Sequence, residues 1–303
     1  MEEYRAKSDY IVLAAADGTP LDRLAVEGRT LEFRRGLIPA TIHFGPDQNR
    51  SYEAGLKHRT YAAEAKQISI AHPKFGDETR PSFQRAMIDG SEVWVDVGLT
   101  SYPAFMSDLQ RRRDNPAAND ALQQLGLTHF NDKWAYLQQA LGTLGLVITK
   151  DGKVVIGIRR TTGREYDGHM DSAASYVLFP PADVEHPEVI DPAQDAKRII
   201  KREFGIPAEA IKSLIPVGFH GHPNTGEFDI AHIAHVDLTK EDHFAPGKYP
   251  KDAERKLEDL VFIEGFRGVQ RVLKGEDMAS EKFMYSTWGA LLSLKPEDFE
   301  KNI

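Results

Sequence analysis

The sequence predicts a mixed α/β (α+β) protein in which a mixed sheet lies between helices, an α/β/α sandwich preceded by a small β-rich N-terminal module. Residues 144–160, LGLVITKDGKVVIGIRR, have the apolar pattern of two strands around the turn Lys150-Asp151-Gly152. Residues 192–204 have helical spacing. Further strand-like runs and helices follow, and such an order of strands and helices is typical of a mixed sheet covered on both faces.

The other elements are predicted from the same periodicities. Before the hairpin we expect strands at 10–15, 24–33, 40–44 and 92–99 and helices at 51–67, 103–124 and 132–140. After it we expect strands at 176–179, 214–220, 228–238 and 261–264 and helices at 192–204, 265–274 and 280–293. The turn-rich segment 72–77 separates the opening elements from the rest, so we place the N-terminal module at residues 1–78 and the second domain at 79–303.

Composition excludes several classes of protein. The 303 residues are 41% hydrophobic and 28% charged, which is ordinary for a soluble globular protein with a sizeable core. The formal net charge of -8 argues against nucleic acid as the main partner. The chain has no cysteine, which excludes disulfides, a thiolate nucleophile and zinc–sulfur sites. Its apolar runs are too short to cross a membrane and its start lacks a signal-peptide pattern, so we expect a cytoplasmic protein.

The helix at 192–204 carries the most informative motif. Asp191 can cap its start, Pro192 suits its first position and Gly205 is a helix-ending signal. From residue 198 to 206 the sequence RIIKREFGI resembles the helical half of a Nudix box, whose pattern is Arg-Glu-apolar-x-Glu-Glu-x-Gly-apolar. The positions that match are Arg198, Ile200, Glu203, Gly205 and Ile206.

Two departures make this a degenerate Nudix box. Ile199 and Arg202 stand where the motif has two of its three glutamates, which supply the acidic face that holds magnesium. The loop before the helix, residues 179–183, has the sequence FPPAD where the family has a Pro-Gly-Gly turn. Proline removes an amide donor, and the residues that replace glycine do not tolerate backbone angles that only glycine adopts.

Four further segments resemble the UDP-glucose and UDP-galactose diphosphatase branch of the Nudix superfamily. They are VGLTSYPAF (97–105), FNDKWAYLQQALGTLGLVITKDGKVVIGIRR (130–160), FIEGFRGVQRVL (262–273) and KFMYSTWGALLSL (282–294). The resemblance covers roughly residues 85–295 and implies the Nudix α/β/α sandwich with an N-terminal extension. It also implies a magnesium-dependent hydrolase that cleaves a UDP-sugar to UMP and a sugar 1-phosphate.

The altered helix has three interpretations, because the three glutamate positions of the box share one helical face. In the first, Glu203 binds one magnesium ion together with Asp195 or Asp191, and a weakened hydrolysis survives. In the second, Arg198 and Arg202 grip a diphosphate by bidentate hydrogen bonds. In the third, the charges form a solvated face, with Glu203 in a salt bridge.

Histidines outside the box suggest a different chemistry. His220 and His222 point to the same side if their segment is extended. With Glu227 or Asp229 from the facing strand, they would form a nitrogen–oxygen metal site or supply a catalytic general base. The glycines and the proline around them also fit a plain surface loop, which is the alternative.

Candidate substrate-binding residues lie before the helix. Arg159 and Arg160 end a predicted strand, where the resemblance implies that one of them reaches the diphosphate; an ordinary strand-end charge is the alternative. Tyr102 can stack on a uracil ring or pack in the core. Asp171 lies in the loop predicted at 161–175, which we expect either to cover the substrate or to be disordered.

We therefore expect a divergent Nudix hydrolase that uses magnesium to cleave a UDP-sugar-like nucleoside diphosphate sugar to a nucleoside monophosphate and a sugar 1-phosphate. One alternative is a catalytically silent module that binds a nucleotide sugar or another anion. The other is a Nudix-fold enzyme recruited to non-hydrolytic acid–base chemistry by its histidines. The expected partner is a small nucleotide-sugar-like molecule, with no nucleic acid and no membrane.

Overall fold

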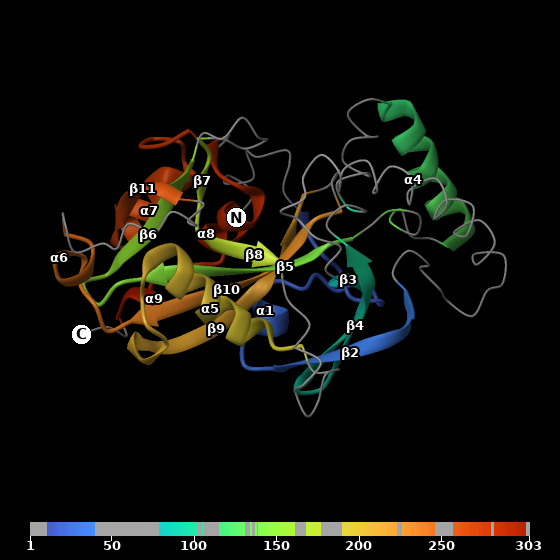
Figure 1. The fold of residues 1–303 in the computed structure, drawn as a ribbon, viewed down its shortest axis with the longest axis horizontal. Coiled ribbons are helices and arrows are strands. Elements are labelled where there is room, and N and C mark those ends of the chain that lie inside the picture. Colours follow the sequence, from blue (N-terminus) through green and yellow to red (C-terminus); the bar gives the residue numbers. More distant parts are fainter. Residues whose placement is uncertain are drawn as a thin grey trace.

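The computed structural model describes residues 11–39, 79–101, 105, 115–130, 134, 137, 139–160, 168–176, 190–222, 226–245, 257–279 and 282–300. These residues build one large mixed sheet, whose strands follow the order β1-β9-β10-β5-β6-β11, with β7 beside β6 and β8 beside β5 (Figure 1). β10 and β5 run parallel, whereas the other pairs in this sheet are antiparallel. The strands are β1 (Ile11–Val12), β5 (Leu141–Ile148), β6 (Lys153–Arg159), β7 (Met170–Asp171), β8 (Ala173–Tyr176), β9 (Ile211–Gly221), β10 (Phe228–Val236) and β11 (Leu257–Glu264).

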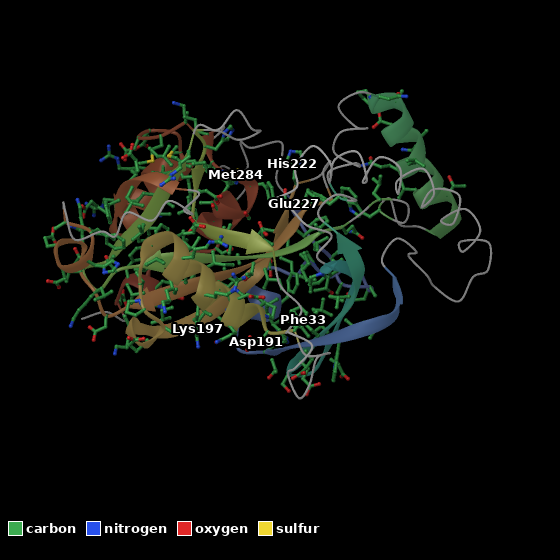
Figure 2. The ribbon with its side chains drawn as sticks, viewed as in Figure 1. Phe33, Asp191, Lys197, His222, Glu227 and Met284 are labelled. Carbon is green, nitrogen blue, oxygen red and sulfur yellow. The ribbon has the colours of Figure 1, made fainter. Side chains whose placement is uncertain are left out.

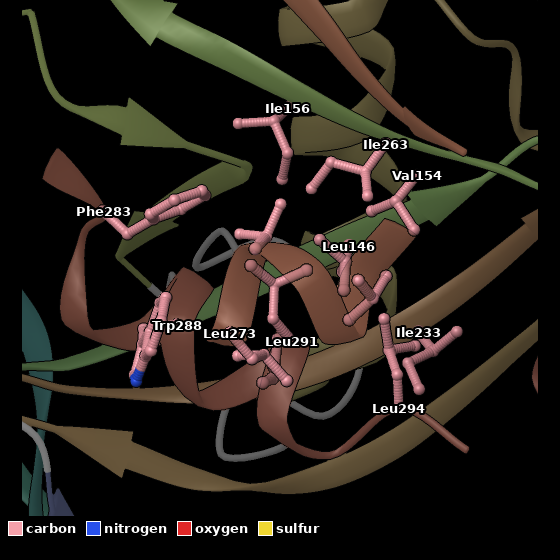
Figure 3. Packing of buried hydrophobic residues seen from close by; sticks show 14 of the residues in the cluster. Leu146, Val154, Ile156, Ile233, Ile263, Leu273, Phe283, Trp288, Leu291 and Leu294 are labelled. Carbon is pink, nitrogen blue, oxygen red and sulfur yellow. The ribbon is translucent and has the colours of Figure 1, made fainter. Parts of the chain in front are cut away.

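Helices cover both faces of this sheet, as the sequence predicts for an α/β/α sandwich. α5 packs on one face, where Ile199 and Val147 belong to one buried cluster. α7 and α8 pack on the other, where Trp288 and Leu146 belong to a second cluster (Figure 3). Val147 and Leu146 are neighbours in β5 and therefore point to opposite faces. The helices are α1 (Arg23–Val26), α4 (Pro116–Phe130), α5 (Pro192–Phe204), the 3-10 helix η2 (Ala208–Ala210), α6 (Lys240–His243), α7 (Gly265–Leu273), α8 (Tyr285–Leu292) and α9 (Glu297–Glu300).

None of the helices in the described part of the chain is long and apolar enough to cross a membrane. The cytoplasmic location stays a prediction.

A smaller sheet has the order β2-β4-β3. Its strands are β2 (Thr30–Pro39), β3 (Thr79–Asp89) and β4 (Glu92–Ser101), and β2 is parallel to β4. β2 pairs with β4, and β1 joins the large sheet through β9, so strand pairs cross the boundary placed at residue 78. The division into residues 1–78 and 79–303 stays a prediction.

Most elements after residue 140 lie where the sequence places them. The hairpin predicted at 144–160 forms β5 and β6, and the helix predicted at 192–204 is α5. The strands predicted at 214–220, 228–238 and 261–264 are β9, β10 and β11, and the helix predicted at 265–274 is α7. These elements carry strong apolar patterns or turn and cap signals, which act over a few residues.

The strand predicted at 24–33 begins only at Thr30. Asp22 caps the short helix α1 by accepting hydrogen bonds from the amides of Leu24 and Ala25. The cap formed by Asp22 therefore favours a helical turn where the apolar pattern predicts a strand.

Residues 170–171 and 173–176 form strands, not the loop predicted at 161–175. β5 and β6 pair only at Val147–Ile148 with Val154–Val155. β7 then pairs with β6 and β8 pairs with β5, so this segment fills the gap between the two strands of the hairpin. β8 ends at Tyr176, the first residue of the strand predicted at 176–179, and residues 177–179 lie outside the described residues.

Other predicted boundaries shift or lie outside the described residues. The helix predicted at 280–293 corresponds to α8, and the one at 103–124 overlaps α4 only in part. The helix predicted at 132–140 does not include Ala140. The carbonyl of Ala140 instead accepts a hydrogen bond from the Phe228 amide at the start of β10. The elements predicted at 40–44 and 51–67 lie outside the described residues.

Candidate functional site

α5 is fixed at both ends. Asp191 Oδ1 accepts a hydrogen bond from the Gln194 amide at 2.9 Å and caps the N-terminus. Gly205 has the left-handed conformation, with φ at 69°, and ends the helix. His243 Nε2 donates to the carbonyl oxygen of Phe204 at 2.8 Å, because a carbonyl can only accept. The cap and the stop predicted from the sequence are therefore both present.

The face of α5 that carries Asp195, Ile199 and Glu203 is buried, and Ile199 on it packs against the sheet. Ile199 and Glu203 are 0% and 1% exposed, and Asp195 is 8% exposed. These residues are four apart, so they line one face of α5. Ile199 packs in the cluster that includes Val147 and Val155 and is a core residue.

Both buried carboxylates of this face meet a guanidinium of the same helix. Arg202 Nε donates to Glu203 Oε1 at 2.8 Å, and Arg202 Nη2 lies 2.7 Å from the same oxygen. Arg198 Nε and Nη2 donate to Asp195 Oδ1 at 3.1 and 3.0 Å. The Arg198 side chain is 41% exposed, so water screens its pair, whereas the Glu203 side chain is enclosed. The pair at Glu203 is the salt bridge expected in the third interpretation of the helix.

One donor of Arg202 has no acceptor in the described part of the chain. Nη2 is buried, and although it lies close to Glu203 Oε1, only Nε makes a hydrogen bond to that oxygen with acceptable angles. A buried N–H without an acceptor is unfavourable, and an anionic oxygen is the acceptor that a guanidinium binds best. Arg202 is therefore the residue of α5 best suited to meet a phosphate oxygen.

The magnesium site predicted on Asp191, Asp195 and Glu203 does not fit the described residues. Among them, no three His, Asp or Glu side chains come together as a metal-binding group. Asp191 caps α5, Asp195 pairs with Arg198, and a guanidinium beside Glu203 repels a cation.

His220 and His222 meet opposite ends of α8. His220 Nε2 lies 3.5 Å from Oγ of Ser293, the residue that follows α8. The ring of His222 meets Tyr285, the first residue of α8, edge to face with centroids 5.9 Å apart. His220 is 1% exposed, and burial lowers its pKa to about 4. Its Nε2 faces the Ser293 hydroxyl at the end of α8, so the structure favours a packing role for His220.

His232 is buried on the other side of the sheet from α8. Its Nδ1 lies 3.4 Å from Oγ1 of Thr143, a hydroxyl that also donates to the carbonyl of Pro192 at the start of α5. Burial lowers the pKa of His232 to about 4. His232 has the same parity in β10 as Phe228 and Ile230, so it points to the same buried side of the sheet.

Arg159 and Asp171 form the second charged group of the site. Arg159 Nη1 donates to Asp171 Oδ2 at 3.2 Å. Asp171 Oδ1 accepts from the Thr287 hydroxyl of α8 at 2.8 Å and from the Ser172 amide at 2.9 Å. Sequence reasoning proposes Arg159 and Asp171 but misses Thr287. The only signal for it was the resemblance of segment 282–294, which did not single out a residue.

The candidate residues therefore fall into two groups. Figure 2 shows Asp191 and Lys197 along α5, apart from His222 and Glu227, and His222 packs against Tyr285 at the start of α8. Arg160 follows β6 and is half-buried, and Tyr102 lies outside the described residues. The structure thus joins Asp191, Asp195, Arg198, Arg202 and Glu203 on one helix, and it joins Arg159, Asp171, His220 and His222 to α8.

No protein-family model matches the chain, and no curated protein matches it either. Solved structures resemble parts of it. DR0079 from Deinococcus radiodurans is 13% identical, with a TM-score of 0.30 over 47% of this chain and 77% of that chain. Tm1382, a candidate Nudix hydrolase, is 11% identical, with a TM-score of 0.33 over 51% of this chain and 70% of that chain.

A third similar structure is a bifunctional NMN adenylyltransferase/ADP ribose pyrophosphatase from Francisella tularensis. It is 10% identical, with a TM-score of 0.32, and the match covers 65% of this chain and 51% of that chain. The chain thus matches about half of the Francisella protein. At TM-scores this low, the likeness carries no conclusion about activity.

Proposed function

We propose that this chain is a divergent Nudix-type hydrolase that cleaves the diphosphate of a UDP-sugar-like nucleoside diphosphate sugar. The observation that carries the proposal is the pair formed by Arg202 and the enclosed Glu203, in which Arg202 Nη2 lacks an acceptor in the described part of the chain. A phosphate oxygen would satisfy this donor and would bring the diphosphate next to a carboxylate. The resemblance of segments 97–105, 130–160, 262–273 and 282–294 supports the UDP-sugar class.

In this proposal the two residues have separate roles. Arg202 neutralises charge that builds on the non-bridging phosphate oxygens in the transition state. Glu203 takes the proton of a water whose oxygen forms the new bond to phosphorus. The bridging phosphorus–oxygen bond breaks, and the electron pair leaves with the sugar 1-phosphate, while the nucleoside monophosphate takes up the water oxygen.

A second candidate function is binding of the same ligand without cleavage. It is supported by the ion pairs of α5, because Asp195 and Glu203 are each held by an arginine and no metal-binding group of His, Asp or Glu side chains forms among the described residues. Such a module would use the arginines as an anion clamp and would leave the diphosphate intact.

Nucleotide release from a panel of nucleotide sugars and dinucleotides, with magnesium and with a chelator, tests the two functions. For the hydrolase we expect UMP from UDP-glucose or UDP-galactose, and a loss of about a hundredfold or more in Glu203→Gln, because the proton acceptor is gone. Glu209→Gln, an exposed carboxylate in η2, is the matched control and should keep full activity.

The outcomes separate the candidates. Binding of UDP-glucose in calorimetry without release of UMP would support the binding module, and Arg202→Met should then weaken binding while Lys201→Met, an exposed residue of the same helix, should not. Absence of both binding and release for the whole panel would overturn the proposal. A thermal unfolding curve for Glu203→Gln close to that of the wild type would show that the variant is folded.

A further inference from the structure

Asp171 is enclosed and is hydrogen-bonded through both of its oxygens by groups of the protein itself. Its carboxylate is 3% exposed, and both of its oxygens accept hydrogen bonds, Oδ1 from Thr287 and Ser172 and Oδ2 from Arg159. A carboxylate in this state has little capacity left to bind a ligand. Its role is therefore to hold its neighbours in place.

Thr287 is the fixed end of this network. It is 0% exposed in α8, and its hydroxyl both donates to Asp171 and accepts from the Ser172 amide at 3.0 Å. The Ser172 hydroxyl in turn donates to the carbonyl of Gly145 in β5 at 2.7 Å. The position of the Asp171 carboxylate is thus set by a helix and by the neighbouring strand, and buried networks of this kind are rigid when they are fully satisfied.

Arg159 is the more exposed end of the network. Its side chain is 26% exposed, whereas that of Asp171 is 5% exposed. Arg159 and Val155 are four residues apart in β6, so strand alternation places them on the same face of the sheet. Val155 packs in the cluster beneath α5, whereas α8 covers the opposite face. Thr287 and Arg159 each donate a hydrogen bond to Asp171, so this carboxylate links α8 to a guanidinium on the α5 side of the sheet.

We propose that Thr287 and Asp171 are positioning residues that hold the guanidinium of Arg159 for the diphosphate of the ligand. This inference rests on the proposed function, because it names a second cation for the same diphosphate. A fixed guanidinium loses less conformational freedom when it binds a phosphate than a mobile one does. Asp171 then contributes to affinity without touching the ligand.

The test is a double-mutant cycle in which calorimetry measures the dissociation constant of UDP-glucose for each variant. Thr287→Val keeps the volume of the side chain but removes the hydroxyl, and we expect it to weaken binding about tenfold, the scale of one hydrogen bond to a charged group. Thr287→Ser keeps the hydroxyl and should bind like the wild type. Arg159→Met should weaken binding at least as much as Thr287→Val, and adding Thr287→Val to it should have no further effect, because the residue that Thr287 positions is absent.

Each outcome has a distinct meaning. Binding by Thr287→Val equal to the wild type would overturn the inference and leave the proposed function intact. Equal losses from Thr287→Val in the presence and absence of Arg159 would also overturn it, because they would show a general packing effect. If the wild type does not bind UDP-glucose, the proposed function fails and this inference fails with it. If Thr287→Val does not fold, Asp171→Asn takes its place in the same cycle, because it weakens the hold on Arg159 while keeping an acceptor for Thr287.

Discussion

Arg23 donates a hydrogen bond to each carboxylate oxygen of Asp298, from Nη1 to Oδ2 at 2.5 Å and from Nη2 to Oδ1 at 2.8 Å, although 275 positions separate the two residues. Arg23 is 4% exposed and Asp298 is 0% exposed. Arg23 also donates to both oxygens of Glu27, whose pKa this contact lowers to about 2, and Glu27 meets Lys295 as well. The network joins α1, near the start of the described chain, to α9, near its end.

The first prediction concerns this buried pair. Arg23→Met should lower the free energy of unfolding by about 3–5 kcal/mol, because it leaves the Asp298 carboxylate enclosed without its cation. Urea unfolding at neutral pH measures the loss. Lys150→Met is the matched control, since its pair with Asp237 is exposed on both sides, is screened by water and should contribute far less to stability. Equal effects of the two substitutions would contradict the burial of the Arg23–Asp298 pair.

The second prediction concerns pH. His220 and His232 each have a pKa of about 4 in the folded protein because both are buried, against an ordinary value of 6.5. The unfolded chain therefore binds protons first as the pH falls. The stability linked to these groups is present above about pH 6.5 and is lost as the pH falls toward 4. Each histidine should contribute a slope of up to about 1.4 kcal/mol per pH unit in that window.

Urea unfolding of the wild type at pH 7, 6 and 5 should show this fall. His232→Gln should reduce the slope, because it removes one of the two groups, even if the variant is less stable at pH 7. The same slope in wild type and variant would show that His232 is accessible to protons in the folded state.

Local signals explain what the sequence predicts correctly. α5 begins and ends where Asp191, Pro192 and Gly205 place it, since the cap hydrogen bond and the left-handed stop involve only neighbouring residues. The hairpin of β5 and β6 is likewise predicted by its turn and its apolar strands.

Non-local contacts explain what it does not predict. β5 and β6 separate after a short pairing, and nothing in either strand shows that residues 170–176 fill the gap. The contact of Thr287 with Asp171 joins residues 116 positions apart, and spacing alone cannot indicate it. The candidate site of this chain depends on such contacts, whereas its helix depends on local ones.

For Ile199, two signals in the sequence point to different environments. The family motif indicates a metal-facing position, but Ala196, Ile199, Ile200 and Phe204 have the spacing of a core-facing helical stripe. All four are 0% exposed. The periodicity of this sequence therefore outweighs the analogy with the motif.

The third prediction follows from that burial. Ile199→Glu introduces the glutamate that the motif resembled by residues 198–206 has at this position, but it should lower the free energy of unfolding by about 3 kcal/mol or more, because it places a charge in the core between Asp195 and Glu203. Gln194→Glu, an exposed change on the same helix near its N-terminus, should stay within about 0.5 kcal/mol of the wild type. Wild-type stability of Ile199→Glu would mean that the side chain at position 199 reaches water.

The fourth prediction concerns how closely α5 approaches β5. A Cβ atom on Gly145 would lie 2.5 Å from Cδ1 and 2.7 Å from Cγ1 of Ile200, well inside the optimal separation of about 3.5–4.0 Å for carbon atoms. Gly145→Ala should therefore cost about 1–3 kcal/mol, and Ile200→Ala alone about 2–5 kcal/mol for the cavity that it leaves.

The double variant should lose less stability than the sum of the single losses, because the shorter side chain at 200 makes room for the new methyl group. Urea unfolding of the wild type, the two single variants and the double variant measures this coupling. Ile156→Ala is the control, since Ile156 is equally buried but packs on the face that α8 covers, and its loss should add to that of Gly145→Ala. Additive losses for Gly145→Ala with Ile200→Ala would mean that α5 can move away from the sheet, and the enclosure of Glu203 beneath it would then not be fixed by packing.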